Sequence, residues 1–315
     1  MSTGHHDDDP LARLAAESEF RDRVKAVERD AAKARRRARL RIVRPRGASR
    51  WRAGGSGRRP GRSISWIFLA LLALTAASGV ALWTGFGPVQ GMVFLFVLGT
   101  WLIALSLHEF SHALTAHYGG DDTVEGKGYL RLDLRRYGHP LLTFGLPILF
   151  LVLGGLPLPG GAVMIDSRRL RNRFRDAMVS AAGPAVNVVL AAGFLIIVSL
   201  AGPDDIFGGS PHLAFWSALS FAAWLQVATA ILNLIPVPGL DGYGIIEPYL
   251  SDSKRYIGRR IAPFGMLVLI VLLYLPPVGY AFRAACDFFV TLGGASLDAV
   301  DTGALLFKFW RSWGR

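Results

Sequence analysis

Residues 101–112 read Trp-Leu-Ile-Ala-Leu-Ser-Leu-His-Glu-Phe-Ser-His, so an apolar run leads directly into two histidines and a glutamate. An α-helix advances about 100° per residue, and His108 and His112 therefore share one face, where both imidazoles can hold one metal ion. Glu109 is directed toward the open position of that metal, where it can take a proton from water. Each ionisable side chain in a membrane helix costs on the order of 3 kcal/mol, which favours a metal site over an exposed helix end.

The composition of the chain predicts a membrane protein. Of its 315 residues 52% are hydrophobic and only 18% are charged, which is more apolar than is usual for a soluble fold of this size. A bilayer core of about 30 Å needs roughly 20 apolar helical residues. Runs of this kind occur at 65–84, 91–117, 177–201 and 213–238, with a fifth at 261–275 and a weaker sixth at 278–294. We therefore expect an all-α polytopic membrane protein with about six transmembrane helices.

Positive charge is concentrated at the N-terminus. The first 65 residues carry 18 Lys and Arg against 8 Asp and Glu. Because basic segments stay inside, we expect 1–62 to be a cytoplasmic tail and linker of a cell-membrane protein, in contact with anionic lipid. Nucleic-acid binding is the less favoured alternative, since no groove-reading motif accompanies the charge. The transmembrane domain then covers 63–295, with a core at about 91–250, and 296–315 form an amphipathic, basic C-terminal tail.

The stretch between the second and third apolar runs contains two less regular features. Residues 129–134 and 161–165 have β-like patterns, which predict a small β element at the membrane surface. Residues 141–158 are apolar but are interrupted by glycines and prolines. With the basic tail inside, both flanks of 141–158 are expected on the cytoplasmic side, so we interpret it as a re-entrant or interfacial segment. A full span is the alternative, since a stretch of this length can cross a bilayer.

A catalytic zinc site has three protein ligands and an open position, so a third ligand must come from elsewhere in the chain. The best candidate is Asp241, in the segment Asn-Leu-Ile-Pro-Val-Pro-Gly-Leu-Asp-Gly at 233–242. Its prolines and glycines would loosen the helix and free backbone groups to line a cavity. The expected topology places Asp241 at the same membrane face as the two histidines, whereas an ordinary turn is the alternative interpretation. The remaining histidines of the apolar region, His117, His139 and His212, are not expected to be ligands.

Three motifs, in this order along the chain, resemble those of the site-2 protease family of intramembrane metalloproteases. His108-Glu109-x-x-His112 is similar to the zinc motif of the family. Ala-Gly-Pro-Ala-Val-Asn at 182–187 resembles its Gly-Pro-x-x-Asn element, and 233–242 resembles its second signature. The similarity covers roughly 91–250, and the chain has no insertion large enough for a PDZ domain.

The resemblance implies a three-helix catalytic core with one Zn²⁺, for which His108, His112 and Asp241 are the ligands and Glu109 is the catalytic residue. It also implies that the substrate is the transmembrane segment of another membrane protein, cleaved in regulated intramembrane proteolysis.

The resemblance further implies that Asn187 and Asn233 hold substrate backbone or the oxyanion. From the residues alone, an amide in an apolar span is as readily explained by a hydrogen bond between helices. A non-proteolytic metal-binding or transport protein is the main alternative function, and a membrane-anchored adaptor ranks third. The sequence has no acidic or histidine residues repeated through several spans, which an ion path would need. Two imidazoles and a carboxylate also suit iron or cobalt, and no oligomeric state is predicted.

Overall fold

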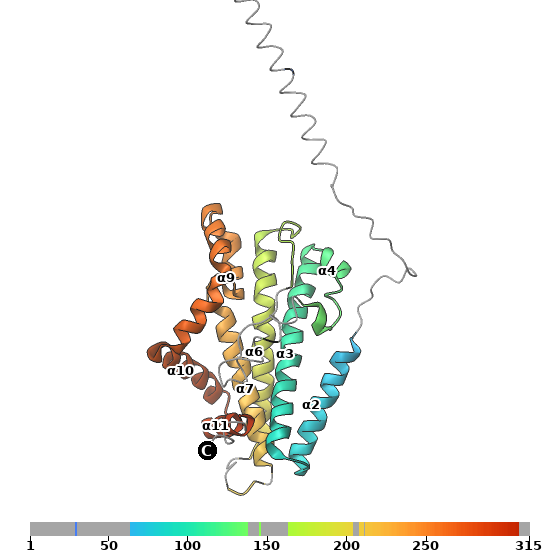
Figure 1. The fold of residues 1–315 in the computed structure, drawn as a ribbon, viewed down its shortest axis with the longest axis vertical. Coiled ribbons are helices and arrows are strands. Elements are labelled where there is room, and N and C mark those ends of the chain that lie inside the picture. The colour runs from blue at the N-terminus through green and yellow to red at the C-terminus, as the bar shows by residue number, and fades with distance from the viewer. Residues whose placement is uncertain are drawn as a thin grey trace, which may run out of the picture. The chain divides into compact units, whose positions relative to one another are not determined.

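The structure is a computed structural model that describes residues 29, 64–137, 145, 163–203, 208–210 and 212–308. One compact unit covers Arg59–Arg315, and Arg29 is the only described residue of the unit before it, Met1–Arg58. The described part of the larger unit consists of helices joined by turns (Figure 1). This architecture confirms the expected all-α class.

Four helices are long and apolar enough to cross a membrane, namely α2 (Trp66–Thr84), α3 (Val89–Gly119), α6 (Arg173–Ala201) and α7 (Leu213–Leu234). They coincide with the first four predicted runs and make the chain a multi-pass membrane protein. Hydrocarbon offers no partner to backbone N–H and C=O groups, so these runs must satisfy them within a helix. Local signals mark the ends of α2. The Ser65 hydroxyl accepts a hydrogen bond from the N–H of Ile67 (3.2 Å), and Gly85 follows in the left-handed conformation.

Helix α7 lies at the centre of the unit, packed against α3, α6 and α11 (Leu297–Phe307) (Figure 1). In the most apolar stretch of α7, 83% of the residues are buried, compared with 22% in that of α2 and 28% in that of α6. Ala223, Leu225 and Leu232 of α7 belong to the main hydrophobic core. Helix α7 is therefore the interior helix, and the exposed apolar faces of α2 and α6 are left for lipid.

The prediction of about six spans is not confirmed. The fifth run lies in α9 (Asp252–Tyr274), whose parts Asp252–Gly265 and Leu267–Tyr274 are bent by 58° and count as a span only when taken together. The sixth run corresponds to α10 (Pro276–Leu292), which has 17 residues, fewer than the roughly 20 of a typical span, and is not among the candidate spans. The described residues therefore provide four spans, or five with the bent pair. Proline explains the start of α10, because Pro276 and Pro277 suit the first turn of a helix and cannot continue α9.

The small β element expected at 129–134 is not confirmed. A single parallel bridge joins Leu132 to Ile64, and the segment otherwise forms turns that end in the 3₁₀ helix η1 (Leu134–Arg136). The carboxylate of Asp133 accepts a hydrogen bond from the backbone N–H of Arg135 (3.2 Å) and so favours a turn over a strand. Tyr129 and Leu130 are buried against the end of α3, which explains why apolar residues recur there.

Three other predictions concern residues that are described only in part. Of the stretch 141–158, only Gly145 is described, so the choice between a re-entrant segment and a span lies outside the described residues. Val163–Ile165, the described part of the second β-like segment, belongs to no strand. In the C-terminal segment α11 packs on α7, where a Cβ on Gly303 would overlap the carbonyl oxygen of Ser217, and 309–315 lie outside the described residues.

Candidate metal centre

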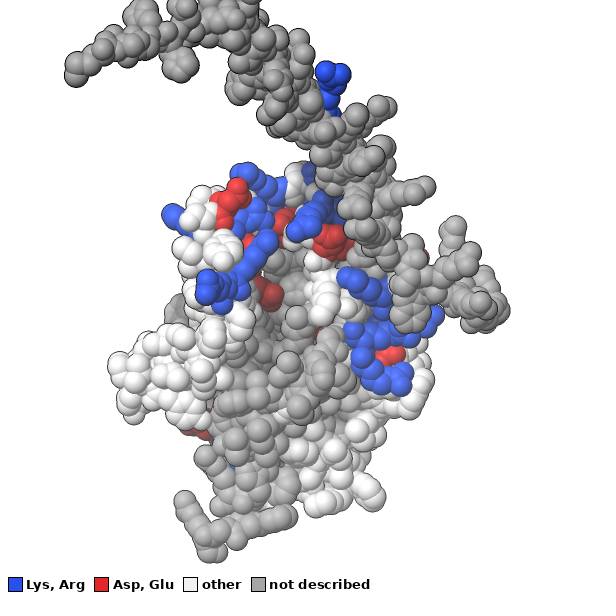
Figure 2. All heavy atoms as spheres, turned by 45° about the horizontal axis from the view of Figure 1, so that its top comes forward, with Lys and Arg blue, Asp and Glu red and all other residues white. Residues whose placement is uncertain are grey.

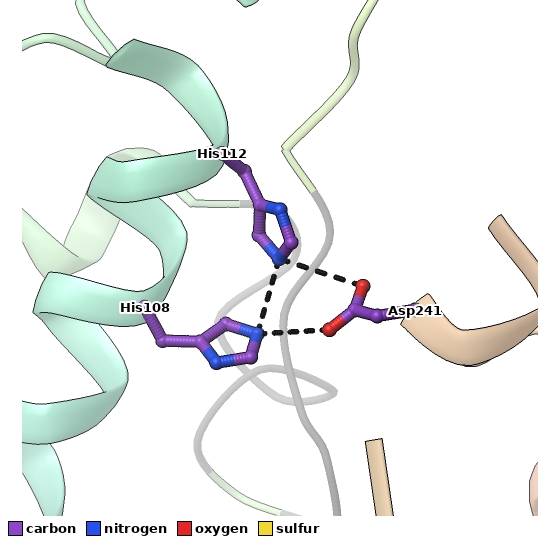
Figure 3. Close-up of side chains that lie close together, drawn as sticks. All are labelled: His108, His112 and Asp241. Atoms are coloured by element: carbon purple, nitrogen blue, oxygen red, sulfur yellow. Dashed lines mark hydrogen bonds and ion pairs between the residues drawn. The ribbon is translucent and has the colours of Figure 1, made fainter. Parts of the chain in front are cut away.

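His108 and His112 lie on α3, on the face that α6 covers. Their side chains are buried, at 6% and 7% exposure, and their Nε2 atoms are 3.1 Å apart. The four-residue spacing places the two rings one helical turn apart, and both point away from the helix axis toward the same point (Figure 3). Two imidazole nitrogens therefore face one small volume inside the protein.

Asp241 reaches the same volume from the other side, at the start of α8 (Asp241–Ile246) (Figure 3). Its Oδ2 atom lies 3.2 Å from Nε2 of His108, and its Oδ1 atom lies 3.4 Å from Nε2 of His112. Helix α7 ends at Leu234, before the two prolines, and α8 folds back on that end. Gly242 permits this turn, because a Cβ there would overlap the carbonyl oxygen of Leu234.

The outward-facing nitrogens of both imidazoles are occupied by hydrogen bonds. Nδ1 of His108 lies 2.6 Å from Oδ1 of Asn187, and Nδ1 of His112 lies 2.7 Å from the carbonyl oxygen of Val179. Since oxygen acceptors face both Nδ1 atoms, each ring carries its proton on Nδ1 and presents a lone pair at Nε2. Such outer partners commonly fix the tautomer of metal-binding histidines.

The donor set fits a divalent cation. The two Nε2 atoms and the carboxylate of Asp241 all offer lone pairs to one another, an arrangement that repels unless a cation lies between them. Tetrahedral zinc with bonds of about 2.0–2.1 Å separates its ligands by roughly 3.3 Å. The separations of 3.1, 3.2 and 3.4 Å found here agree with that value. His108, His112 and Asp241 are therefore residues that could hold the metal, as one nitrogen or oxygen from each lies within 4.8 Å of the others.

Helix α6 presents a matching stripe to the histidines, made of Val179, Gly183 and Asn187 at successive helical turns. Val179 and Asn187 bind the two Nδ1 atoms, and Gly183 lies between them. A Cβ on Gly183 would overlap Nε2 of both histidines. Glycine is thus required at this position because the backbone of α6 approaches the Nε2 atoms of both histidines directly. Sequence reasoning did not single out Gly183 or Val179, although Gly183 stands in the quoted Gly-Pro-x-x-Asn element.

This close approach predicts that Gly183→Ala abolishes metal binding. The added methyl group must displace His108 and His112 or push α6 away. Either change moves the imidazole nitrogens out of the positions in which they could share one metal ion. The matched control is Gly193→Ala on the same helix, where a Cβ meets nothing within 4 Å. Zinc content of the two purified variants, measured by mass spectrometry, should be near zero for Gly183→Ala and unchanged for Gly193→Ala. Equal zinc content in both would show that Gly183 does not face the metal.

Curated proteins are similar to this chain over most of its length. The Rip2 protein of Mycolicibacterium smegmatis is 41% identical over 254 residues, which are 78% of this chain and 94% of the relative. The Rip2 protein of Mycobacterium tuberculosis strain H37Rv is 40% identical over 265 residues, which are 82% of this chain and 98% of the relative. Both carry zinc-metalloprotease names. The chain belongs to the site-2 protease family.

The YwhC protein of Bacillus subtilis strain 168, also with a zinc-metalloprotease name, is 32% identical over 200 residues, 61% of this chain and 84% of the relative. No protein-family model and no solved structure matches the chain. As a member of the site-2 protease family the protein is a metalloendopeptidase, and its cofactor is Zn²⁺. The buried set of two imidazoles and one carboxylate is consistent with that cofactor.

Glu109 lies beside the centre in this site-2 protease. It follows His108 on α3, is 3% exposed, and accepts a hydrogen bond from the backbone N–H of Val163. Its Oε2 atom is buried and has no hydrogen-bond partner among the described residues. An unpaired buried carboxylate oxygen is costly, so Oε2 is suited to receive water or a substrate group.

The charge of Asp241 agrees with a role as an anionic ligand. Burial by itself would raise the pKa of this carboxyl, but its interactions with His112 and His108 together more than offset burial and lower the pKa below its ordinary value. A divalent cation between the same atoms acts in the same direction, because it also favours the ionised carboxylate.

The remaining candidates are placed as follows. Asn233 is 3% exposed and lies in the last turn of α7, before the segment that carries Asp241. His117 lies near the end of α3, with Nδ1 3.8 Å from Oδ1 of Asp122. The ring of His212 stacks on Trp83 at 3.7 Å, so His212 packs the opposite end of the bundle. Neither histidine joins the described metal group, whereas His139 lies outside the described residues.

Proposed function

We propose that this metalloendopeptidase hydrolyses peptide bonds within the transmembrane segments of other membrane proteins. The observation that carries the proposal is the position of the metal centre on a spanning helix. His108 lies 11 residues before the end of α3, which corresponds to about 16 Å of helix. A second spanning helix, α6, covers the same site, and the segment that follows the central helix α7 carries Asp241. A site on one spanning helix and covered by another suits a substrate that is itself in the bilayer.

In the proposed mechanism His108, His112 and Asp241 hold Zn²⁺, and Glu109 is the general base. When bound, Zn²⁺ supplies Lewis-acid polarisation of the peptide carbonyl and of the attacking water. Glu109 takes a proton from that water through its unpaired Oε2 atom and later returns it to the amine that leaves. The low exposure of Glu109 excludes bulk water from this proton transfer. Asn233 remains a candidate for contact with the substrate backbone or the oxyanion.

The distribution of charge supports a site that opens toward the cytoplasm. All Lys and Arg of 64–308 except Arg283 and Lys308 lie in segments at one end of the bundle, where α3 and α7 end and α6 and α9 begin. Figure 2 shows Lys and Arg side chains, with acidic ones among them, around a hollow in the surface. By the positive-inside rule this end is cytoplasmic, and α2 then begins on the cytoplasmic side.

The proposal predicts where substrates are cut. Full-length protein reconstituted in liposomes, incubated with a set of single-span membrane proteins, should cleave bonds inside or at the cytoplasmic end of their hydrophobic segments. Mass spectrometry of the fragments locates the bonds. Removal of metal with 1,10-phenanthroline should stop cleavage, and added Zn²⁺ should restore it. Cleavage confined to water-exposed loops of the same proteins would contradict the intramembrane assignment and would leave an ordinary metalloendopeptidase.

A further inference from the structure

A chain of two side-chain amides joins His108 to the central helix. Oδ1 of Asn187, on α6, lies 2.6 Å from Nδ1 of His108, and Nδ2 of Asn187 donates to Oε1 of Gln226 at 2.8 Å. Asn187 and Gln226 are 2% and 1% exposed. Each polar end of the Asn187 amide is therefore engaged with a protein group. The chain His108–Asn187–Gln226, here called the relay, links α3, α6 and α7.

The order of atoms in this relay decides which nitrogen of His108 is free for a metal. The amide oxygen of Asn187 can only accept, so it requires the His108 proton on Nδ1 and leaves the lone pair on Nε2. A rotated Asn187 amide would present a donor to Nδ1 and drive the proton to Nε2, where it would block the metal. Oε1 of Gln226 disfavours this rotation, because the Asn187 oxygen would then face the Gln226 oxygen unless the Gln226 amide rotated as well.

The two histidines differ in how they are held. His112 donates to a backbone carbonyl, that of Val179, whose position depends on helix α6 and not on any side chain. His108 depends on side chains alone, first Asn187 and then Gln226. The polar Gln226 side chain also lies in the most buried helix of the unit, where an unpaired amide is costly, and the relay is what satisfies its oxygen.

We propose that Asn187 and Gln226 are positioning residues, which fix the tautomer and orientation of His108 and so set the affinity of the metal centre. This assignment rests on the proposed role of His108 as a metal ligand. It gives Asn187 a different role from substrate or oxyanion binding, since the hydrogen bonds of its amide are directed at His108 and Gln226. Gln226, which lies 39 residues beyond Asn187 in the sequence, becomes part of the functional site.

The test uses the metal-free full-length protein in detergent and Co²⁺ as the probe. Co²⁺ affinity is measured by titration, and the visible d–d absorption of bound Co²⁺ reports the ligand geometry. Asn187→Leu removes the acceptor for Nδ1 of His108, and Gln226→Met removes the partner of the Asn187 amide while retaining similar length. We expect Co²⁺ to bind roughly 10- to 100-fold more weakly to Asn187→Leu, with an altered spectrum, and a smaller change in the same direction for Gln226→Met.

Two variants make the result specific. Asn187→Asp keeps an oxygen toward His108, and Gln226 can then turn its NH₂ group to the new carboxylate, so this variant should retain most of the affinity and the wild-type spectrum. Thr229→Val is the packing control, because Thr229 lies on the same buried helix but its hydroxyl donates to Leu225 of its own helix at 2.8 Å. Thr229→Val should bind Co²⁺ like the wild type.

Wild-type affinity and spectrum in Gln226→Met and Asn187→Leu would overturn the proposal. If Asn187→Leu does not fold, Gln226→Met and Asn187→Asp decide, and wild-type behaviour of Gln226→Met is sufficient to reject the relay. His108→Ala in the same titration separates this inference from the proposed function. Loss of binding in His108→Ala with no effect of the relay variants would refute the relay alone. Unchanged binding in His108→Ala would refute the metal site itself.

Discussion

Replacing Glu109 by Gln is expected to lower the rate of peptide-bond hydrolysis roughly 10²- to 10⁴-fold, the usual contribution of a general base. The amide has nearly the shape of the carboxylate but cannot take a proton from water. Glu109 does not belong to the group of three possible ligands, so zinc should stay bound at one ion per chain. The measurements are initial cleavage rate in liposomes and zinc content of the same preparation.

If Glu109 is the general base, the cleavage rate of Glu109→Gln must fall while its zinc content stays unchanged. Glu109→Asp serves as a companion variant, because it keeps the acid but withdraws it by one methylene, and it should retain more activity than Glu109→Gln. Full activity in Glu109→Gln would eliminate Glu109 as the base. Loss of zinc together with activity would show instead that Glu109 supports the metal.

Removal of a ligand is expected to have a still larger effect, because it should abolish metal binding and hydrolysis together. His108→Ala, His112→Ala and Asp241→Ala each leave two of three ligands. We expect the zinc affinity to fall by more than about 100-fold, beyond the range typical of outer partners. Equilibrium dialysis against a zinc buffer measures the affinity, and the liposome assay measures cleavage.

Matched controls exist for both ligand types. His117→Ala changes a histidine on the same helix, and Asp252→Ala changes an exposed aspartate at the start of α9. Both should keep zinc and activity. If Asp241→Ala bound zinc as tightly as the Asp252→Ala control, the third ligand would have to be another residue. The position of Asp241 beside the two histidines would then have no role in metal binding.

Much of the fold follows from simple physical constraints on the sequence. The four spans were predictable because backbone groups in lipid must be satisfied within a helix, and long apolar runs can do this in only one way. The last two runs are not confirmed as separate spans, since the fifth is bent by 58° within α9 and the sixth lies in a helix of only 17 residues. The β element expected from the alternation at 129–134 is likewise not confirmed, because the Asp133 side chain competes for the backbone and favours a turn.

The site was predictable where it depends on local spacing. His108 and His112 share a face because they are four residues apart, and a break after Leu234 frees Asp241 to turn toward them. Gly183 and Gln226 could not be predicted in the same way. Their roles depend on which faces of α6 and α7 meet α3, and helix contacts of this kind follow from packing in three dimensions. An amide such as Asn187 has no spacing signal that separates a bond to histidine from a bond to substrate.

The central claim is that two imidazoles of one spanning helix and one remote carboxylate hold a single Zn²⁺. X-ray absorption at the zinc edge on detergent-purified Glu109→Gln protein tests it most directly, because the spectrum reports the number and type of ligands. The account predicts one zinc per chain with two imidazole nitrogens, the remaining ligands being oxygen, and loss of the zinc in Asp241→Ala. A spectrum without imidazole scattering, or an unchanged spectrum in Asp241→Ala, would contradict it.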